Sequence, residues 1–233
     1  MSANAGLLLE RLLETVAGSD DYFVSGSLSF LPLLGNCRQP EHDVDAAIER
    51  GVFERGKRVL SAVERIRVLR LSEVAIASEL RLPRLLSPRT GFVHVTGPLG
   101  LLDVSCYRKR KNALVFTLGA GLTLEVPASV MGRCRDLSWE GVRYRAGPPE
   151  LAFIPKAVSH LRARARRKGS RSPERTNDPD VRRLARIVDW NYVAELLEEG
   201  GLRWMGRHLP PAVASRIDPF GGSEILSLRQ ALL

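Results

Sequence analysis

The sequence has few of the residues from which disulfides and zinc sites are built. Its 233 residues include four histidines and only three cysteines, Cys37, Cys106 and Cys134. The cysteine number is odd, the spacing is wide and no Cys-x-x-Cys pair occurs, which argues against a disulfide framework and against a zinc site. These features predict a reduced, cytoplasmic protein.

Long apolar segments are also absent. No stretch approaches the roughly 20 residues of a membrane span. Near the start, Glu10, Arg11 and Glu14 interrupt the leucines before the apolar region of a signal peptide can form. We therefore expect no membrane association. Hydrophobic residues still make up 44% of the chain, which is enough to build a core and excludes a disordered protein.

Negative charge is the scarcer sign. The chain carries 35 Lys and Arg against 26 Asp and Glu, a formal net charge of +9. An excess of this kind favours a polyanionic partner, and nucleic acid is the first candidate. A genome rich in G and C would also produce an arginine-rich protein, so the charge alone does not assign a function.

The most informative stretch is residues 23–48, which predicts a strand, a tight turn, a short apolar helix, a polar loop and a second strand. The turn is Ser25-Gly26-Ser27. Gly26 permits close approach of the backbone to a ligand, and Ser27 offers a hydroxyl. A helix that begins here directs its N-terminus at the turn, which favours anions such as phosphate.

The second strand of that stretch carries Asp43 and Asp45. Side chains two positions apart on a strand share a face, so both carboxylates are expected to project together, with Val44 facing the core. Adjacent carboxylates repel one another unless a cation lies between them. Mg²⁺, or Mn²⁺, would neutralise the pair and leave coordination positions for the oxygens of a triphosphate.

A third carboxylate, Asp103, lies within the apolar segment Leu101–Ser105. A lone Gly-Ser or a lone Asp-x-Asp is common and often marks a solvated loop. The Gly-Ser turn, the Asp-x-Asp strand and the later aspartate, in this order, resemble the DNA polymerase β-type nucleotidyltransferase superfamily. The resemblance implies that Asp43 and Asp45 bind the metal, that Gly26 and Ser27 hold the phosphates, and that Asp103 is a metal ligand or the base.

Residues 149–157 extend this resemblance. Their sequence, PELAFIPKA, is similar to the entry of the helical half in bacterial toxin and antiphage (AbiEii/MenT-like) nucleotidyltransferases. The resemblance implies that Lys156 reaches the nucleotide phosphates, a role that suits a compact, mobile charge. The alternative is that Lys156 is only a solvent-exposed lysine at a helix end. Of Asp178 and Asp180, one is expected to orient Lys156 or Arg162 and the other to cap the helix, and the sequence leaves open which does which.

The densest positive charge follows that segment. Seven basic residues lie between positions 162 and 175. The first of them alternate with alanines, and the last two lie in a segment that contains Gly, Ser and Pro. They are Arg162, Arg164, Arg166, Arg167, Lys168, Arg171 and Arg175. Arg162, Arg164, Arg166 and Arg167 are the candidate RNA-binding residues, since each phosphate contact releases counterions. A solvated helix end followed by a loop is the alternative interpretation.

Periodicity predicts an α+β fold with a small mixed sheet, flanking helices and a helical C-terminal part. We expect a nucleotidyltransferase core over residues 1–148 and a helical domain over 149–233, divided after the Gly-Pro-Pro cluster. Expected helices cover 5–17, 52–65, 72–80, 150–168, a segment from 178, and 190–199 capped by Asp189; expected strands cover 92–95, 101–107, 113–118, 122–126 and 142–145, with a basic turn at 108–111. Residues 66–71 fit either a helix or a strand.

The resulting hypothesis is an Mg²⁺-dependent nucleotidyltransferase that uses a nucleoside triphosphate. Its acceptor is an RNA, with tRNA the first choice, and the resemblance implies a toxin that is paired with an antitoxin protein. Two alternatives are an enzyme that modifies a small molecule of the antibiotic type, which needs an acidic acceptor pocket, and one that modifies a protein. A binding protein without chemistry is disfavoured because all three aspartates are present.

Overall fold

The computed structural model describes residues 5–35, 43–62, 67–70, 92–97, 100–119, 122–157, 178–198 and 229–230. Its centre is a mixed sheet, and nine strands belong to it within these ranges. They are β1 (Tyr22–Val24), β2 (Asp43–Glu49), β3 (Arg67–Arg70), β4 (Phe92–Gly97), β5 (Gly100–Arg110), β6 (Ala113–Gly119), β7 (Leu122–Pro127), β8 (Arg135–Trp139) and β9 (Val142–Ala146). The α+β class with a mixed sheet is therefore confirmed.

The strand order is β3-β4-β5-β2-β1-β9-β8, and β6 and β7 continue from the far end of β5. β5 runs parallel to β2 and antiparallel to both β4 and β6. β1 is antiparallel to β2 and parallel to β9. The two strands with aspartates, β2 and β5, are thus direct neighbours in the middle of the sheet.

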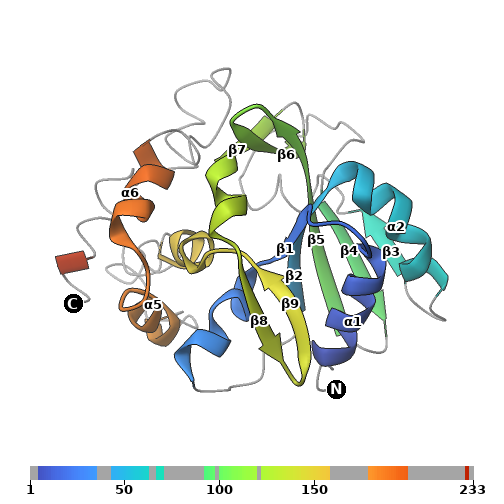
Figure 1. Cartoon of the computed structure of the whole chain (residues 1–233), viewed down its shortest axis with the longest axis horizontal. Helices are drawn as coiled ribbons and strands as arrows, with labels where there is room; N and C mark the ends of the chain where they lie inside the picture. Colours follow the sequence, from blue (N-terminus) through green and yellow to red (C-terminus); the bar gives the residue numbers. More distant parts are fainter. Residues whose placement is uncertain are drawn as a thin grey trace, which may run out of the picture.

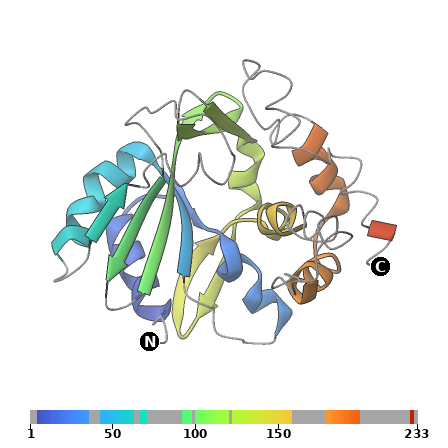
Figure 2. The same ribbon diagram turned by 180° about the vertical axis from the view of Figure 1, so that it is seen from behind.

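Helices lie on both sides of this sheet. On one side are α1 (Ala5–Thr15) and α2 (Arg50–Ala62); on the other are η3 (Ala128–Arg133), the helix of residues 149–157, α5 (Asp178–Leu184) and α6 (Trp190–Glu198) (Figure 1). The view from behind shows the same separation (Figure 2). None of the helices in the described ranges has the length and apolarity needed to cross a membrane.

Sequence periodicity explains the first helix pair. Leu8, Leu9 and Leu12 are at most 3% exposed, as the helical spacing of the leucines predicts. α1 and α2 approach closely at Gly56, where a Cβ atom would lie 1.8 Å from the Thr15 carbonyl oxygen. The prediction for α1 is confirmed, and α2 begins at Arg50 and ends at Ala62, slightly ahead of the expected range.

Three local expectations need correction. The expected basic turn is wrong for Arg108, Lys109 and Arg110, because β5 extends through these residues and the turn occupies only 111–112. The short apolar helix is a pair of 3₁₀ helices, η1 (Gly26–Ser29) and η2 (Leu31–Leu34). The third is β8, which was not expected at all. For residues 66–71, where helix and strand were both open, the structure has a strand over 67–70. The helix expected over 72–80 lies outside the described residues.

The buried side chains of the sheet and of the C-terminal helices belong to one cluster. Phe153, Tyr192 and Leu196 are completely buried together with Phe23 and Tyr107 of the sheet. The helical part is thus packed directly on the sheet, and the division into two domains at residue 148 stays a prediction.

Candidate active site

Two of the three aspartates lie side by side. Asp45 of β2 and Asp103 of β5 are register partners in the parallel pair, and both are half-buried. Val44 between the strand aspartates is 1% exposed, as expected for the opposite face. Tyr107, four positions after Asp103, shares the aspartate face, and its hydroxyl lies 3.8 Å from Met131 Sδ of η3. The aspartates therefore lie on the face that η3 covers, opposite α1 and α2.

The Gly-Ser turn meets this pair through Asp45. The N–H of Ser25 donates to the main-chain carbonyl oxygen of Asp45 at 2.8 Å. Gly26 has a φ of 58°, and a Cβ atom on it would lie 1.9 Å from Asp45 Oδ2. The Asp45 carboxylate thus occupies the space where a side chain at position 26 would be, which requires glycine both for conformation and for volume.

Replacing Gly26 with Ala should therefore damage the site. The left-handed backbone costs about 1–3 kcal/mol for a residue with a side chain, and the new methyl group must push the Asp45 carboxylate aside. A misplacement of about 1 Å in a catalytic group can lower a rate by roughly 100-fold. The measurements are the rate of the nucleotidyl transfer that the sequence predicts and the thermal unfolding midpoint.

Gly35→Ala is the matched control for that change. Gly35 also has a positive φ, 63°, but a Cβ atom there meets nothing within 4 Å. It should reproduce the loss of stability without the loss of rate. Equal rates for Gly26→Ala and the wild type would contradict the placement of Asp45 against the turn.

For Asp43, the remaining aspartate of the motif, the structure describes only the backbone. Asp43 is the first residue of β2 and is the register partner of Leu101, and its side chain lies outside the described part of the structure. Among the described side chains, no three His, Cys, Asp or Glu residues form a group that would hold a metal. Asp45 and Asp103 supply two carboxylates, and Asp43, two positions before Asp45, stays the predicted third. The half-buried Ser27 lies in η1 directly after Gly26.

Lys156 lies beside η1 on the helix of residues 149–157. Its Nζ is 3.6 Å from Asp180 Oδ2 and 5.7 Å from the centre of the Phe30 ring, which directly follows η1. Asp180 is buried and Lys156 keeps a 20% exposed side chain. Asp180, one of the two aspartates considered for orienting Lys156, contacts it; Asp178 is the first residue of α5, and its side chain lies outside the described part of the structure.

Contacts between η3 and α6 hold the helical part in place. Arg133 Nη1 lies 3.2 Å from Asp189 Oδ2, and the Arg133 guanidinium stacks 3.8 Å above the Tyr192 ring. The Asp189 N–H donates to the buried Glu150 carboxylate at 2.7 Å. Arg133 and Glu150 were not among the predicted site residues: Arg133 belongs to no sequence motif, and Glu150 lies in the segment 149–157 without a role assigned to it.

Asp189 also caps α6, as predicted. Its Oδ1 accepts hydrogen bonds from the N–H groups of Asn191 at 3.0 Å and Tyr192 at 3.3 Å. The hydrogen bond from Arg133, followed by that from Tyr192, holds the pKa of the Asp189 carboxyl below its ordinary value.

Asp189→Ala should lower the thermal midpoint by a few degrees through the loss of this cap. A carboxyl with a depressed pKa in the folded state stabilises the protein above its ordinary pKa of 3.8 and loses that effect as the pH falls. The difference between wild type and Asp189→Ala should therefore be full at pH 6 and shrink below pH 3.8. Asp189→Asn, which keeps the cap, is the control; an equal midpoint for Asp189→Ala at pH 6 would contradict the cap.

Several predicted residues lie outside the described part of the chain. These are the RNA-binding candidates Arg162, Arg164, Arg166 and Arg167. His94 of β4 is the register partner of Asp103 in the antiparallel pair. Cys106 and Cys134 are free thiols, and burial raises the pKa of Cys134.

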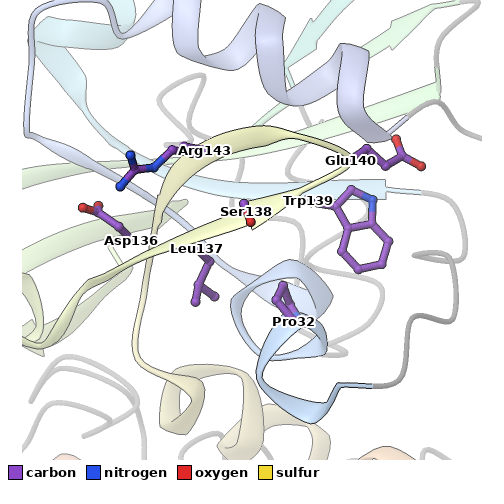
Figure 3. A pocket seen from close by; sticks show the side chains of 7 residues that line it. All are labelled: Pro32, Asp136, Leu137, Ser138, Trp139, Glu140 and Arg143. Atoms are coloured by element: carbon purple, nitrogen blue, oxygen red, sulfur yellow. The ribbon is translucent and has the colours of Figure 1, made fainter.

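A hollow of about 610 Å³ lies along β8 and η2. Figure 3 shows Pro32 of η2 near Leu137 and Trp139, with Asp136 and Arg143 farther along the hairpin. Trp139 is 5% exposed, and Glu140 in the following turn accepts a hydrogen bond from the N–H of Gly6 at 3.1 Å. The lining of this hollow includes neither Asp45 nor Asp103.

Comparison with known proteins gives only distant likenesses. No family model matches the sequence, and no curated protein matches it. The structure is similar to the lincosamide antibiotic adenylyltransferase LnuA, lincomycin-bound, with a TM-score of 0.49 and 10% identity over 78% of this chain and 95% of that one. It is also similar to ANT(2'')-Ia, an antibiotic-resistance factor. The TM-score is 0.42 and the identity 13% both for its solution structure, over 97% of this chain and 90% of that one, and for its complex with adenylyl-2''-tobramycin, over 97% of each chain.

Proposed function

We propose that the protein is a nucleotidyltransferase, which moves a nucleoside monophosphate from a nucleoside triphosphate to an acceptor hydroxyl. The observation that carries this proposal is the row formed by Gly26, Asp45 and Asp103. A left-handed glycine turn touches one carboxylate, and the second carboxylate is its partner on the next strand. This arrangement pairs a turn suited to phosphate with acidic groups suited to a divalent cation.

The chemistry of the donor set fits a hard cation. Asp45 and Asp103 offer carboxylate oxygens on adjacent strands, and oxygen ligands of this kind suit a hard cation. Asp43, Asp45 and Asp103 would hold Mg²⁺ or Mn²⁺. When bound, the ion neutralises charge on the triphosphate and on the group in transfer.

The chain's own groups supply the other roles. Gly26 and Ser27 would hold the β- and γ-phosphates at the start of η1. Lys156, already directed toward η1, would stabilise the charge that develops on pyrophosphate. Asp103 would either bind the metal or act as the general base that takes the proton of the acceptor hydroxyl. The second role is open to it because it lies beside Asp45 with part of its surface open to solvent.

The acceptor that the charge of the chain supports is RNA. A net charge of +9 attracts a polyanion and disfavours a polycationic small molecule. We take tRNA as the first acceptor to test. A toxin role and an antitoxin partner rest on the sequence resemblance alone and remain predictions.

One observation favours a second candidate, a small-molecule acceptor. The hollow beside η2 carries two carboxylates, Asp136 and Glu140, and the indole of Trp139. An acidic hollow with an aromatic wall suits an amine-bearing ligand. Arg143 in the same lining opposes that preference, so RNA stays the main proposal.

The test is a labelling experiment. Each α-labelled nucleoside triphosphate is incubated with the protein and with total RNA, purified tRNA, an aminoglycoside, a lincosamide or a cell extract. We expect label on RNA that depends on Mg²⁺ or Mn²⁺ and disappears with EDTA. Label on the antibiotic or on a protein with none on RNA would overturn the RNA acceptor, and no label on any acceptor would overturn nucleotidyl transfer. Full activity after exhaustive EDTA treatment would contradict the metal.

A further inference from the structure

Four consecutive basic residues form one end of the β5–β6 hairpin. Arg108, Lys109 and Arg110 end β5, and Lys111 lies in the two-residue turn that follows. We call these four residues the basic tip. All four side chains are exposed. The sequence pattern singled them out only as a turn, and the proposed chemistry does not use them.

Neighbouring acids neutralise the basic tip only in part. Lys109 pairs with Asp21, and Arg110 Nη1 lies 3.4 Å from Glu125 Oε1, both in exposed ion pairs of the kind that contribute little. The facing strand supplies no charge: Arg108 is opposite Val115 and Arg110 is opposite Ala113. The basic tip therefore keeps a net positive charge toward solvent.

The basic tip belongs to the same strand as the catalytic candidate Asp103. Five positions separate Asp103 from Arg108, which at about 3.4 Å per residue is roughly 17 Å along β5. Figure 1 shows β5 as one long strand from its pairing with β2 to its pairing with β6. By strand alternation, Lys109 shares the face of Asp103, and Arg108 and Arg110 belong to the opposite face. Tyr107, between Asp103 and the basic tip, is completely buried, so a polymer with one end at the aspartates would pass over the outside of the protein to reach the basic tip.

We infer that the basic tip is a docking surface for the sugar-phosphate backbone of the acceptor RNA. This inference rests on the proposed function, because it takes the acceptor end of the RNA to lie at the aspartates. Arginine and lysine side chains at the tip contact phosphates without reading bases, so the surface binds RNA independently of sequence. Contacts of this type release counterions and make affinity fall with salt.

The experiment measures RNA binding without any nucleotide. Fluorescently labelled tRNA is titrated with wild-type protein and with Arg108→Ser/Lys111→Ser between about 50 and 200 mM salt. These two positions are chosen because they leave the ion pairs of Lys109 and Arg110 intact. Since each lost phosphate contact lowers the slope of log affinity against log salt by about 0.7–0.9, we expect the slope to fall by about 1–2.

The matched control removes the same charge elsewhere. Arg58→Ser/Arg186→Ser changes two exposed arginines on α2 and after α5, and its slope should stay within error of wild type. Equal slopes for all three proteins, or an equal decrease in both double variants, would overturn the docking surface. Because NTP is absent, this outcome is distinguishable from failure of the proposed function, which would appear as tip-dependent RNA binding without any labelling of RNA.

Discussion

Asp45→Asn is expected to lower the rate of nucleotidyl transfer by at least about 1,000-fold, which corresponds to about 4 kcal/mol of transition-state stabilisation. The amide keeps the shape of the side chain against Gly26 but loses the charge that a divalent cation requires. Asp103→Asn should have a comparable effect, because its carboxylate is the register partner of Asp45 and serves the same ion or the acceptor proton. The measurement is single-turnover transfer at saturating nucleotide.

Stability separates this result from simple unfolding. Both substitutions preserve volume, and removal of one of two neighbouring carboxylates relieves repulsion in the metal-free protein. The free energy of unfolding should therefore change by less than about 1 kcal/mol. Glu10→Gln, an exposed residue on α1 on the far side of the sheet, is the control that removes one carboxylate without a change in rate. Transfer by Asp45→Asn within tenfold of wild type would remove Asp45 from the active site.

The central part of the site could be predicted because it depends on strand alternation. Alternation along β2 assigns Asp43 and Asp45 to one face of the sheet and Val44 to the other, and Val44 is indeed buried. That Asp103 lies beside Asp45 follows once Leu101–Ser105 is recognised as a neighbouring strand. The contact between Gly26 and the Asp45 carboxylate does not follow, since it depends on how η1 leaves β1 rather than on a residue pattern.

Other elements escaped prediction for identifiable reasons. β8 reads Arg-Asp-Leu-Ser-Trp, and only Trp139 is buried because the strand lies at the edge of the sheet. Its polar residues are typical of a loop, and an edge strand needs few apolar positions. The end of β5 was interpreted as a turn for the same reason: Arg108 and Arg110 are solvated, yet they continue the pairing with β6.

The pairing of Lys156 with Asp180 was one of two alternatives that sequence left open. The two residues are on different helices, and the choice between Asp178 and Asp180 depends on the rotation of α5. Asp180 is buried with Val181 and Leu184, which fixes that rotation. The same burial predicts that the ion pair has a structural role in addition to any role with nucleotide.

Lys156→Ala should weaken productive nucleotide binding by about one to two orders of magnitude, since a charge-assisted contact to phosphate contributes about 1.5–3 kcal/mol. It should also destabilise the protein by about 1–3 kcal/mol, because the buried Asp180 carboxylate loses a partner. The measurements are apparent nucleotide affinity from transfer kinetics, binding of the RNA acceptor, and chemical unfolding. RNA binding should change less than nucleotide affinity.

The double variant Lys156→Met/Asp180→Asn separates the two roles of this ion pair. Methionine keeps the length of the lysine chain, and asparagine carries no charge that needs a partner, so most of the lost stability should return. Nucleotide affinity should remain as low as in Lys156→Ala, because the phosphates still lack their cation. Asp180→Asn alone leaves Lys156 charged and should retain more affinity than either variant without the lysine. If the double variant recovered nucleotide affinity together with stability, Lys156 would be a structural residue and the phosphate contact would belong to another cation.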